Sequence, residues 1–345
     1  MDGFAVRAAD TPGTLPVAFR IPAGAPVEAP LPPASAAGIA TGAVVPTGAD
    51  SVVPIERVVE RNGTVTVAEP CEPGAHVRPR GGDVGEGDEL AGAGAAVGAV
   101  LVGALAAAGV GEVQCARRPR VAVLATGSEL RAPGADLGPG QIYESNGAML
   151  AAVLALAGVT VERLPVVADD ERAHRRLLER GLEADVLVTS GGVSVGPHDL
   201  VRRVLSDLGV EEVFWGVAVK PGKPLAFGVR GDTLVFGLPG NPVSSLVASL
   251  LFVRPALSAL QGASDRGPRY EVGSVATALV RNAHRDELVR ARRSWTDDGV
   301  LLEPVSGQES HMIVRASSAD ALVHVPRGSG EIPAGSRVRY LTLSP

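Results

Sequence analysis

The sequence has few cysteines, few aromatic residues and no excess of basic charge. Its two cysteines, Cys71 and Cys115, are far apart and in no metal-ligand spacing, which argues against a disulfide framework and against a zinc site. The formal net charge of −6 argues against a nucleic-acid-binding protein, because such proteins normally carry a basic face. Aromatic residues make up only 3% of the chain, so we expect alanine and valine to fill much of the core.

Signals for secretion and for membrane insertion are also weak. The first residues combine neither a basic segment nor an apolar one, so no secretory signal is visible and we expect a cytoplasmic protein. Residues Ala91 to Gly111 carry no charge over a length that could cross a bilayer. Most of them are alanine and glycine, which favour insertion only weakly. We therefore expect no membrane span here, but a small-residue helix that packs against another element of a soluble protein.

Length and composition predict several domains. A chain of 345 residues is too long for one core, and its 46% apolar and 20% charged residues are typical of a soluble globular protein. Short alternating runs predict a small β domain over residues 1–80 and a second one over residues 267–345. Between them we expect a linker domain over residues 81–118, which holds the Ala/Gly-rich helix, and an α/β domain over residues 119–264.

Strands and helices alternate in the predicted α/β domain. The predicted strands are 121–124, 159–167, 185–189, 213–219, 225–229 and 233–236. Helix starts are indicated by Ser145, by Asp169-Asp170 and by Pro242, and an apolar stripe runs from Val201 to Leu208. This alternation predicts the α/β class: a largely parallel, three-layer α/β/α domain, flanked by the two small β domains and a short helical linker region.

Glycines, carboxylates and lysines recur where the predicted strands end. In an open parallel sheet, ligands bind outside the carboxyl ends of the strands, so we expect these residues to share one edge of the sheet. They are Thr126-Gly127-Ser128-Glu129, Asp169-Asp170, Ser190-Gly191-Gly192-Val193-Ser194 with Asp199, Lys220-Pro221-Gly222-Lys223-Pro224 and Leu238-Pro239-Gly240-Asn241-Pro242.

The chemistry of these residues predicts a site for a phosphate group and a magnesium ion. Tandem glycines let backbone N–H groups approach an anion closely, and the helix start that follows adds a favourable dipole. Lys220 and Lys223 can neutralise an oxyanion. Glu129, Asp169 and Asp199 are hard oxygen ligands, which suit Mg²⁺ that carries substrate phosphates and several waters.

Each feature also has a purely structural interpretation. The aspartates could be helix caps, Pro-Gly-Asn-Pro could be a turn, and the lysines could be solvated surface charges. The six histidines are scattered, and none lies at metal-ligand spacing.

A Gly-x-Ser-x-Gly pattern raises a different enzymatic possibility. Gly192 to Gly196 matches the nucleophile elbow of esterases, with Ser194 as the nucleophile. The late histidines that such an enzyme needs, His284 and His311, lie in the separate β domain. Pro197 also places the next helix later than an elbow requires, so an esterase is disfavoured.

Seven motifs follow one another in a fixed order along essentially the whole chain. They are Met1-Asp2-Gly3-Phe4-Ala5; Thr41-Gly42-Ala43 through Pro46 to Gly48-Ala49-Asp50; Arg78-Pro79-Arg80-Gly81-Gly82-Asp83; Ala125-Thr126-Gly127-Ser128-Glu129-Leu130; Ser190 to Gly196 with Asp199; Lys220 to Pro224; and Leu238 to Pro242. Together they resemble the molybdopterin molybdenumtransferase family, which includes bacterial MoeA proteins and the E domain of gephyrin.

The resemblance implies an activity and a set of site residues. Family members take adenylylated molybdopterin and molybdate, cleave the pyrophosphate with Mg²⁺, leave molybdenum on the dithiolene and release AMP. The implied catalytic residues are Asp2, Thr41, Asp83, Glu129 and Asp199, and the implied metal ligands are Glu129, Asp169 and Asp199. The residues expected to hold the substrate are Asp169, Ser190, Gly191, Gly192, Ser194, Lys220, Lys223, Pro239, Gly240, Asn241, Pro242 and Ser310.

The resemblance also implies a homodimer, whose active cleft is shared between the α/β domain of one subunit and the first β domain of the other. An adenylyltransferase of the same pathway is the expected protein partner. Family members usually carry a segment before the Met-Asp-Gly motif, so we expect this sequence to be a fragment or to have a misassigned start. Gly216 stands where many relatives place a basic residue, and Phe4 where tyrosine is common, which predicts one missing anion contact and one missing hydroxyl.

Two alternative functions follow from the same resemblance. The chain could be a non-catalytic scaffold similar to the gephyrin E domain, but a scaffold has no need for aligned carboxylates that repel one another. It could also be a molybdopterin adenylyltransferase of the MogA type, which the flanking β domains disfavour.

Overall fold

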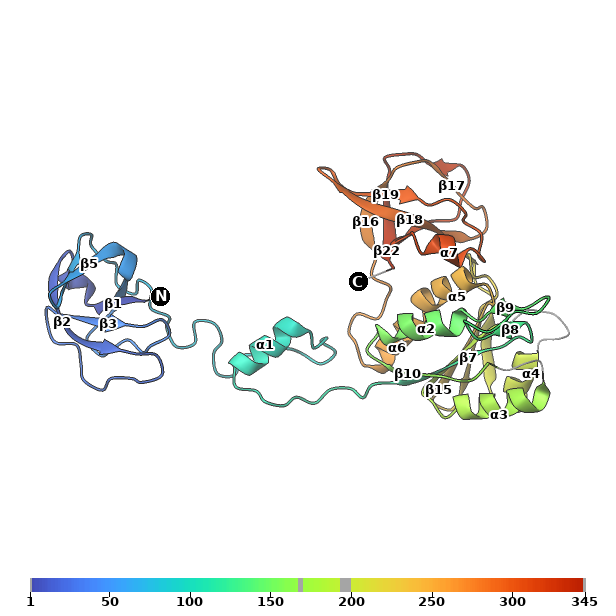
Figure 1. The fold of residues 1–345 in the computed structure, drawn as a ribbon, viewed down its shortest axis with the longest axis horizontal. Coiled ribbons are helices and arrows are strands. Elements are labelled where there is room, and N and C mark those ends of the chain that lie inside the picture. Colours follow the sequence, from blue (N-terminus) through green and yellow to red (C-terminus); the bar gives the residue numbers. More distant parts are fainter. Residues whose placement is uncertain (1, 167–169, 193–199, 344–345) are drawn as a thin grey trace. The chain divides into compact units, whose positions relative to one another are not determined.

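The computed structural model describes residues 2–166, 170–192 and 200–343 (Figure 1). Three predicted site residues, Asp169, Ser194 and Asp199, lie outside the described residues. The chain divides into two compact units, residues 1–90 and residues 91–345. This division does not test the domain boundaries expected near residues 80, 118 and 264, which stay predictions.

The first unit is built around a six-stranded sheet. Its strands lie in the order β4-β1-β3-β2-β6-β5, with bounds β1 Gly3–Val6, β2 Gly13–Ile21, β3 Ala36–Ile39, β4 Ser51–Pro54, β5 Val58–Arg61 and β6 Thr64–Val67. Successive residues of a strand point to opposite faces, and β1 buries Phe4 and Val6 in one apolar cluster and Ala5 in another. Valine and alanine thus contribute to both apolar clusters of this unit, as the composition predicted.

The linker helix is shorter and more exposed than the sequence predicted. Helix α1 covers only Ala99–Ala107, and none of its residues is buried, so the expected packing against another element is wrong for the described structure. Glycine costs about 1 kcal/mol relative to alanine inside a helix, and Gly92, Gly94 and Gly98 precede α1. Gly94 has φ +86°, which no right-handed helix allows.

A second six-stranded sheet forms the α/β domain. Its order is β10-β7-β11-β15-β14-β12, with bounds β7 Arg120–Ala125, β10 Thr160–Arg163, β11 Val186–Ser190, β12 Glu211–Trp215, β14 Ala226–Arg230 and β15 Thr233–Leu238. The pairs β10–β7, β7–β11 and β11–β15 are parallel, whereas β14 runs antiparallel to both of its neighbours. The predicted strand 213–219 breaks at Gly216, whose φ is +84°, and its end becomes β13 Val219–Lys220 in a different sheet.

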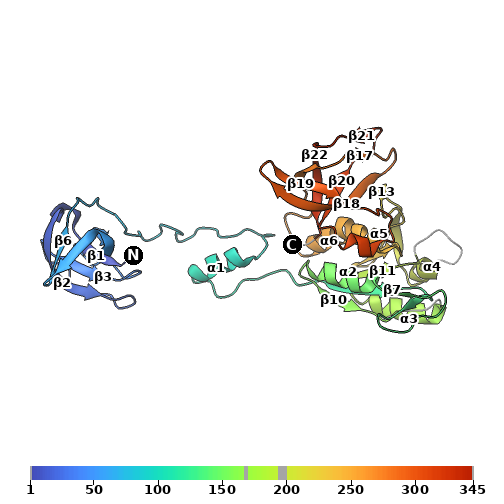
Figure 2. The ribbon, with the colours of Figure 1, turned by 45° about the horizontal axis from the view of Figure 1, so that its top comes forward.

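Helices cover both faces of this sheet, which confirms the predicted three layers (Figures 1 and 2). One side carries α2 Asn146–Ala155, α5 Pro242–Ala248, a π-helical turn Ser249–Val253 and α6 Arg254–Leu260, and the other carries α3 Glu171–Gly181 and α4 Leu200–Asp207. Strand β7 shows why both faces are apolar: Val121 and Val123 pack with the first group, and Ala122 and Leu124 with the second.

The continuous helical segment Pro242–Leu260 is long and apolar enough to cross a membrane by length and composition. Half of its apolar window is buried inside the structure. Val247 and Leu257 belong to the main core cluster, so the segment has the character of a core helix.

Acidic side chains cap two of these helices. Asp170 accepts a hydrogen bond from the Ala173 N–H at 2.6 Å, which confirms its predicted role as the cap of α3. The predicted cap of α2, Ser145, makes no such bond. Its neighbour Glu144 accepts from the Gly147 N–H at 2.5 Å instead, because the longer side chain reaches the first turn.

The C-terminal residues form a small barrel. Strands β18, β19, β16, β22 and β20 close into a ring through the extra pairing of β18 with β20, and β13 extends it on one side. The bounds are β16 Glu271–Val275, β17 Leu279–Val280, β18 Asp286–Thr296, β19 Gly299–Pro304, α7 Ile313–Ala316, β20 Ala321–Val325, β21 Glu331–Ile332 and β22 Arg337–Thr342. The local sequence pattern did not predict β18, the longest strand among the described residues, because its many charges hide the alternating pattern.

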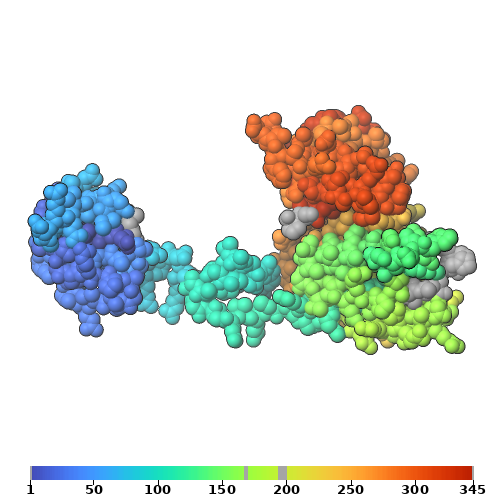
Figure 3. Space-filling model, in the orientation of Figure 1, coloured from blue at the N-terminus to red at the C-terminus, as the bar shows by residue number. Residues whose placement is uncertain are grey.

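The barrel and the α/β domain share a core. Leu288, Leu322 and Leu341 of the barrel belong to the same apolar cluster as Leu250 and Leu257 of the helices. Figure 3 shows the orange and red barrel packed on the green and yellow α/β domain. Residues of the barrel can therefore reach the edge of the α/β sheet.

Candidate active site

A cavity of about 470 Å³ lies where β7, β11 and β15 end. These three strands are parallel neighbours in the sheet, so their carboxyl ends meet at one edge. The loops that follow them line the cavity with Thr126, Gly127, Glu129, Ser190, Gly191, Gly192, Gly240, Asn241 and Pro242. The cavity has the size of a small-molecule site.

The structure gathers some of the predicted site residues and separates others. Glu129, Ser190, Gly191, Gly192, Gly240, Asn241 and Pro242 line the cavity. Pro239, Ser310, Lys220 and Lys223 do not belong to its lining in the described part of the chain. Asp2, Thr41 and Asp83 belong to the first unit.

The tandem glycines after β11 are required by packing. Gly191 has φ +92°, and a Cβ atom there would lie 2.7 Å from the Thr126 carbonyl oxygen. Gly192 has φ +65°, and its Cβ would lie 2.4 Å from Cγ2 of Val201. The N–H of Gly191 already donates to the Leu238 carbonyl at 3.1 Å, so that group is engaged within the chain. Only glycine fits this close approach of three loops.

A buried polar network connects the cavity to the helices. Nδ2 of Asn146 donates to the Ser190 Oγ at 2.8 Å and to the Gly240 carbonyl at 2.6 Å. The Ser190 Oγ lies 3.3 Å from the Ser245 Oγ, and the Ser245 hydroxyl donates to the Pro239 carbonyl. Both serines are fully enclosed. The network holds the loops after β11 and β15 together.

Glu144 and His174, which no sequence motif indicated, also line the cavity. Glu144 is buried, and its Oε2 lies 3.2 Å from Nη2 of Arg163. His174 of α3 is 1% exposed, and its Nδ1 lies 2.9 Å from the Asp170 carbonyl oxygen. Both residues contribute to the cavity wall. His174 lies within α3 and Glu144 just before α2, at positions where no motif of the sequence indicates a site residue.

A loop of the barrel, residues 307–312, forms another part of the wall through His311. Asn241 donates to the Ser310 Oγ at 2.9 Å, and the Ser310 carbonyl accepts from the Val243 N–H at 3.0 Å. These two contacts connect Ser310 to the start of α5.

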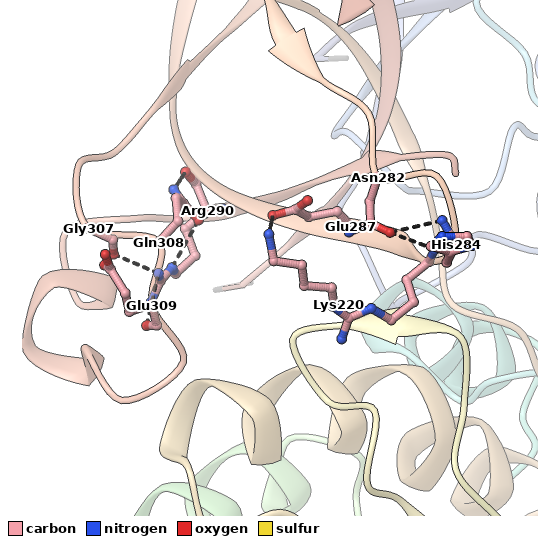
Figure 4. Close-up of polar contacts among 9 residues, drawn as sticks. Lys220, Asn282, His284, Glu287, Arg290, Gly307, Gln308 and Glu309 are labelled. Atoms are coloured by element: carbon pink, nitrogen blue, oxygen red, sulfur yellow. Dashed lines mark hydrogen bonds and ion pairs between the residues drawn. The ribbon is translucent and has the colours of Figure 1, made fainter. Parts of the chain in front are cut away.

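Arg290 holds the same loop from inside the barrel. This side chain is 1% exposed and donates to the Gly307 carbonyl at 2.6 Å, as Figure 4 shows. Its backbone N–H donates to Oε1 of Gln308 at 3.0 Å. Burial lowers the pKa of the Arg290 guanidinium below its usual range. The loop is therefore fixed from both sides, by Arg290 and by α5.

Lys220 takes a position apart from the cavity lining. Its Nζ lies 2.9 Å from Oε1 of Glu287 on β18 (Figure 4). The Lys220 side chain is 45% exposed, and β13 pairs with β18 of the barrel. A carboxylate of the chain itself thus neutralises the lysine that was expected to face an oxyanion.

The described residues contain one of the three predicted metal ligands. Glu129 lies against Gly127, where a Cβ atom would meet its Oε2 at 2.5 Å. Within the described residues, no group of three or more His, Cys, Asp or Glu side chains could hold a metal ion. Glu129 suits Mg²⁺ as a hard oxygen donor at the cavity wall, and the other two predicted donors lie outside the described residues.

Asp2 and Thr41 lie together within the first unit. Oδ1 of Asp2 accepts from the Thr41 N–H at 2.7 Å. Hydrogen bonds from the backbone and the side chain of Thr41 lower the pKa of Asp2. Two motifs separated by almost forty residues therefore form one exposed carboxylate–hydroxyl pair.

Family models match the chain over three consecutive ranges. Residues 1–109 match the MoeA N-terminal region (domain I and II), residues 122–259 match a probable molybdopterin binding domain, and residues 273–343 match the MoeA C-terminal region (domain IV).

Known proteins are similar over the full length. The chain is 36% identical to molybdopterin molybdenumtransferase 2 of Mycobacterium tuberculosis, an alignment that covers 100% of this chain and 88% of that relative. It is 35% identical to the molybdopterin molybdenumtransferase of Haemophilus influenzae, over 98% of this chain and 85% of the relative. Among solved structures, a molybdopterin biosynthesis MoeA protein of Pyrococcus horikoshii has a TM-score of 0.77 at 32% identity, over 100% of this chain and 87% of that chain.

Proposed function

Since the chain belongs to the molybdopterin molybdenumtransferase family, and is thus an enzyme of molybdenum cofactor biosynthesis, we propose that it inserts molybdenum from molybdate into adenylylated molybdopterin. In the proposed reaction the pyrophosphate bond of the substrate is cleaved, the dithiolene keeps the molybdenum, and AMP is released.

One observation carries the proposal: the loops after β7, β11 and β15 line a single cavity. These loops contain a carboxylate, the glycine pair and the Pro-Gly-Asn-Pro turn of the sequence motifs. A position outside the carboxyl ends of parallel strands is where open α/β sheets bind small ligands. We therefore place the pterin-bearing substrate in this cavity.

We assign Glu129 as one donor to a magnesium ion. The carboxylate lies at the cavity wall, and Asp169 and Asp199 are the other donors that the sequence motifs predict. When bound, Mg²⁺ would neutralise phosphate charge during cleavage of the pyrophosphate. The chain's own residues have separate tasks: the glycine pair lets the loops approach closely, and the Asn146–Ser190–Ser245 network keeps the cavity wall fixed.

The roles of Asp2, Thr41 and Asp83 are proposed as catalytic, and the chain is proposed to act as a cytoplasmic homodimer that receives its substrate from an adenylyltransferase. The Asp2–Thr41 hydrogen bond supports the first part, because it joins two of these residues in one exposed carboxylate–hydroxyl pair. Sedimentation velocity of the full chain tests the dimer: a single species of monomer mass at micromolar concentration would contradict it.

The decisive experiment follows AMP release from adenylylated molybdopterin with Mg²⁺, with and without molybdate. Release that depends on molybdate supports the proposed reaction. A folded protein that releases no AMP contradicts it and favours a scaffold function. Conversion of molybdopterin and ATP into adenylylated molybdopterin would instead identify an adenylyltransferase.

A further inference from the structure

One aromatic ring lines the cavity in the described part of the chain, the ring of Tyr143. Tyr143 is 47% exposed and its neighbour Ile142 is 55% exposed, so two large apolar side chains of the cavity wall face solvent. Small-molecule sites are concave and are lined largely by apolar and aromatic side chains. The exposed ring therefore offers a contact surface for an apolar or flat part of a ligand.

The three tyrosines of the chain differ in their contacts. Tyr340 is 1% exposed, and its hydroxyl donates to Oε2 of Glu271 at 2.5 Å. Tyr270 lies against Arg339, whose Cζ is 4.8 Å from the ring centroid. The side chain of Tyr143 has no hydrogen bond and no aromatic or cationic ring partner among the described residues. Its ring is thus free to contact a ligand.

A two-stranded element fixes the position of Tyr143. Strand β8 Leu130–Arg131 pairs in parallel with β9 Ile142–Tyr143 (Figure 1). The N–H groups of the residues before and after Tyr143 donate to the carbonyls of Glu129 and Arg131, at 2.9 and 2.8 Å. The backbone of Tyr143 is therefore held one strand spacing, about 5 Å, from the strand that directly follows Glu129.

We propose that the ring of Tyr143 stacks on a flat heteroaromatic ring of the substrate and so positions the substrate phosphates at Glu129. The inference rests on the proposed function, under which the pyrophosphate of the substrate lies between a pterin and an adenine. Phosphates that are held by a magnesium ion at Glu129 bring one of these two rings next to β9. Either ring has the π-face that stacking on tyrosine requires.

The test uses isothermal titration calorimetry on the full chain, with pterin and AMP as separate ligands. Tyr143→Leu keeps an apolar side chain but removes the π-face, whereas Tyr143→Phe keeps the face and removes the hydroxyl. We expect Tyr143→Leu to weaken the binding of one ligand about tenfold, the effect of one lost stacking contact, and Tyr143→Phe to bind it within about twofold of the unmodified protein. The ligand that responds identifies the stacked ring.

Steady-state kinetics of AMP release separate a positioning role from a structural one. Tyr143→Leu should raise the KM for adenylylated molybdopterin about tenfold and leave kcat unchanged, because stacking binds the substrate and the transition state equally. Trp295→Leu is the matched control, since Trp295 is 72% exposed but lies on β18, outside the described cavity lining. This control should change neither KM nor either affinity. The KM decides the question where a free ligand binds too weakly for calorimetry.

The proposal is overturned if Tyr143→Leu keeps the KM of the unmodified protein, or if Tyr143→Phe loses as much affinity as Tyr143→Leu. Circular dichroism checks that the variants fold, which the exposure of the Tyr143 side chain leads us to expect. Molybdate-dependent AMP release with an unaltered KM in Tyr143→Leu would remove only this inference. Binding of pterin or AMP that depends on the Tyr143 ring, without AMP release, would remove only the proposed reaction.

Discussion

Strand β11 has polar residues at both of its ends, and the hydrogen bonding of these residues differs between the two ends. Just before the strand, Asp185 accepts two hydrogen bonds from Arg117, at 2.6 and 2.7 Å, and one from the Arg120 N–H at 2.6 Å. At the other end, Ser190 is the last residue of the strand and accepts a hydrogen bond from Asn146, whose Oδ1 has no partner among the described residues. The carboxylate at the amino end is satisfied by the protein itself, whereas one acceptor at the carboxyl end, Oδ1 of Asn146, has no partner among the described residues.

The difference separates stability from function within one strand. The hydrogen bonds from Arg117 lower the pKa of Asp185 to about 2, so this carboxylate stays charged and paired. The carboxyl end instead gathers glycine loops, an acidic residue and an unpartnered acceptor around a cavity. We expect changes of polar side chains at the amino end to affect unfolding alone and changes of the cavity carboxylate at the carboxyl end to affect turnover, whereas crowding of the glycine pair should affect folding.

The largest effect is expected for Gly192→Ala at the carboxyl end. The new Cβ would meet Val201 at 2.4 Å, and φ is +65°, so both crowding and backbone strain should destabilise the fold by about 2–5 kcal/mol. Gly209→Ala is the matched control, because Gly209 has φ +81° and open space around its Cβ position. Urea unfolding should give about 1–2 kcal/mol for the control. Equal losses for the two variants would show that crowding at the cavity is unimportant.

Glu129→Gln tests the cavity at the carboxyl end of β11 through its effect on enzyme activity. We expect molybdate-dependent AMP release to fall about 100-fold, because a proposed donor to the magnesium ion is lost, while the free energy of unfolding stays the same. Asp185→Asn should show the opposite pattern, with a loss of about 1–3 kcal/mol in unfolding free energy and normal turnover. A loss of turnover in Asp185→Asn with intact folding would break the distinction between the two ends.

Lys220 forms an ion pair with Glu287 and was also expected to face the anionic substrate, so its role in substrate binding can be tested. If it contacts the anionic substrate, Lys220→Gln should raise KM about tenfold, because hydrogen bonds to charged groups are strong. Glu287→Gln releases the lysine from its ion pair and should leave KM unchanged or lower it. Steady-state kinetics of both variants decide the matter: an unaltered KM in Lys220→Gln assigns the residue to a purely structural ion pair.

The smallest expected effect is the pH dependence of the unfolding free energy that Asp185 contributes at the amino end of β11. The pKa of Asp185 is about 2 in the folded chain against an ordinary value of 3.8, so its stabilising contribution is complete above pH 4 and is lost as the pH falls toward 2. Arg117 is largely exposed, so we expect only about 1 kcal/mol. The difference in unfolding free energy between the unmodified chain and Asp185→Asn should shrink by that amount between pH 5 and pH 2.5. A constant difference over this range would contradict the assigned ion pair.

The convergence of three loops at the cavity could be predicted because parallel neighbours carry their carboxyl ends to one edge. The position of Lys220 could not. Strand β12 ends at the same edge, but β14 and β12 are added beyond β15, so the segment after β12 starts two strand spacings, about 10 Å, from β15. Strand order depends on long-range pairing, which no local pattern contains.

The sequence by itself determined the alternation of strands and helices, the apolar faces of the sheet, the cap at Asp170 and the family, because these depend on residue order within short segments and on ordered motifs. Only the tertiary structure decided that Asn146, Glu144 and His174 line the cavity, that Arg290 holds the Ser310 loop and that Glu287 neutralises Lys220. The physical reason is the same in each case: these contacts join segments far apart in the chain, so they exist only after the sheet, the helices and the barrel have packed together.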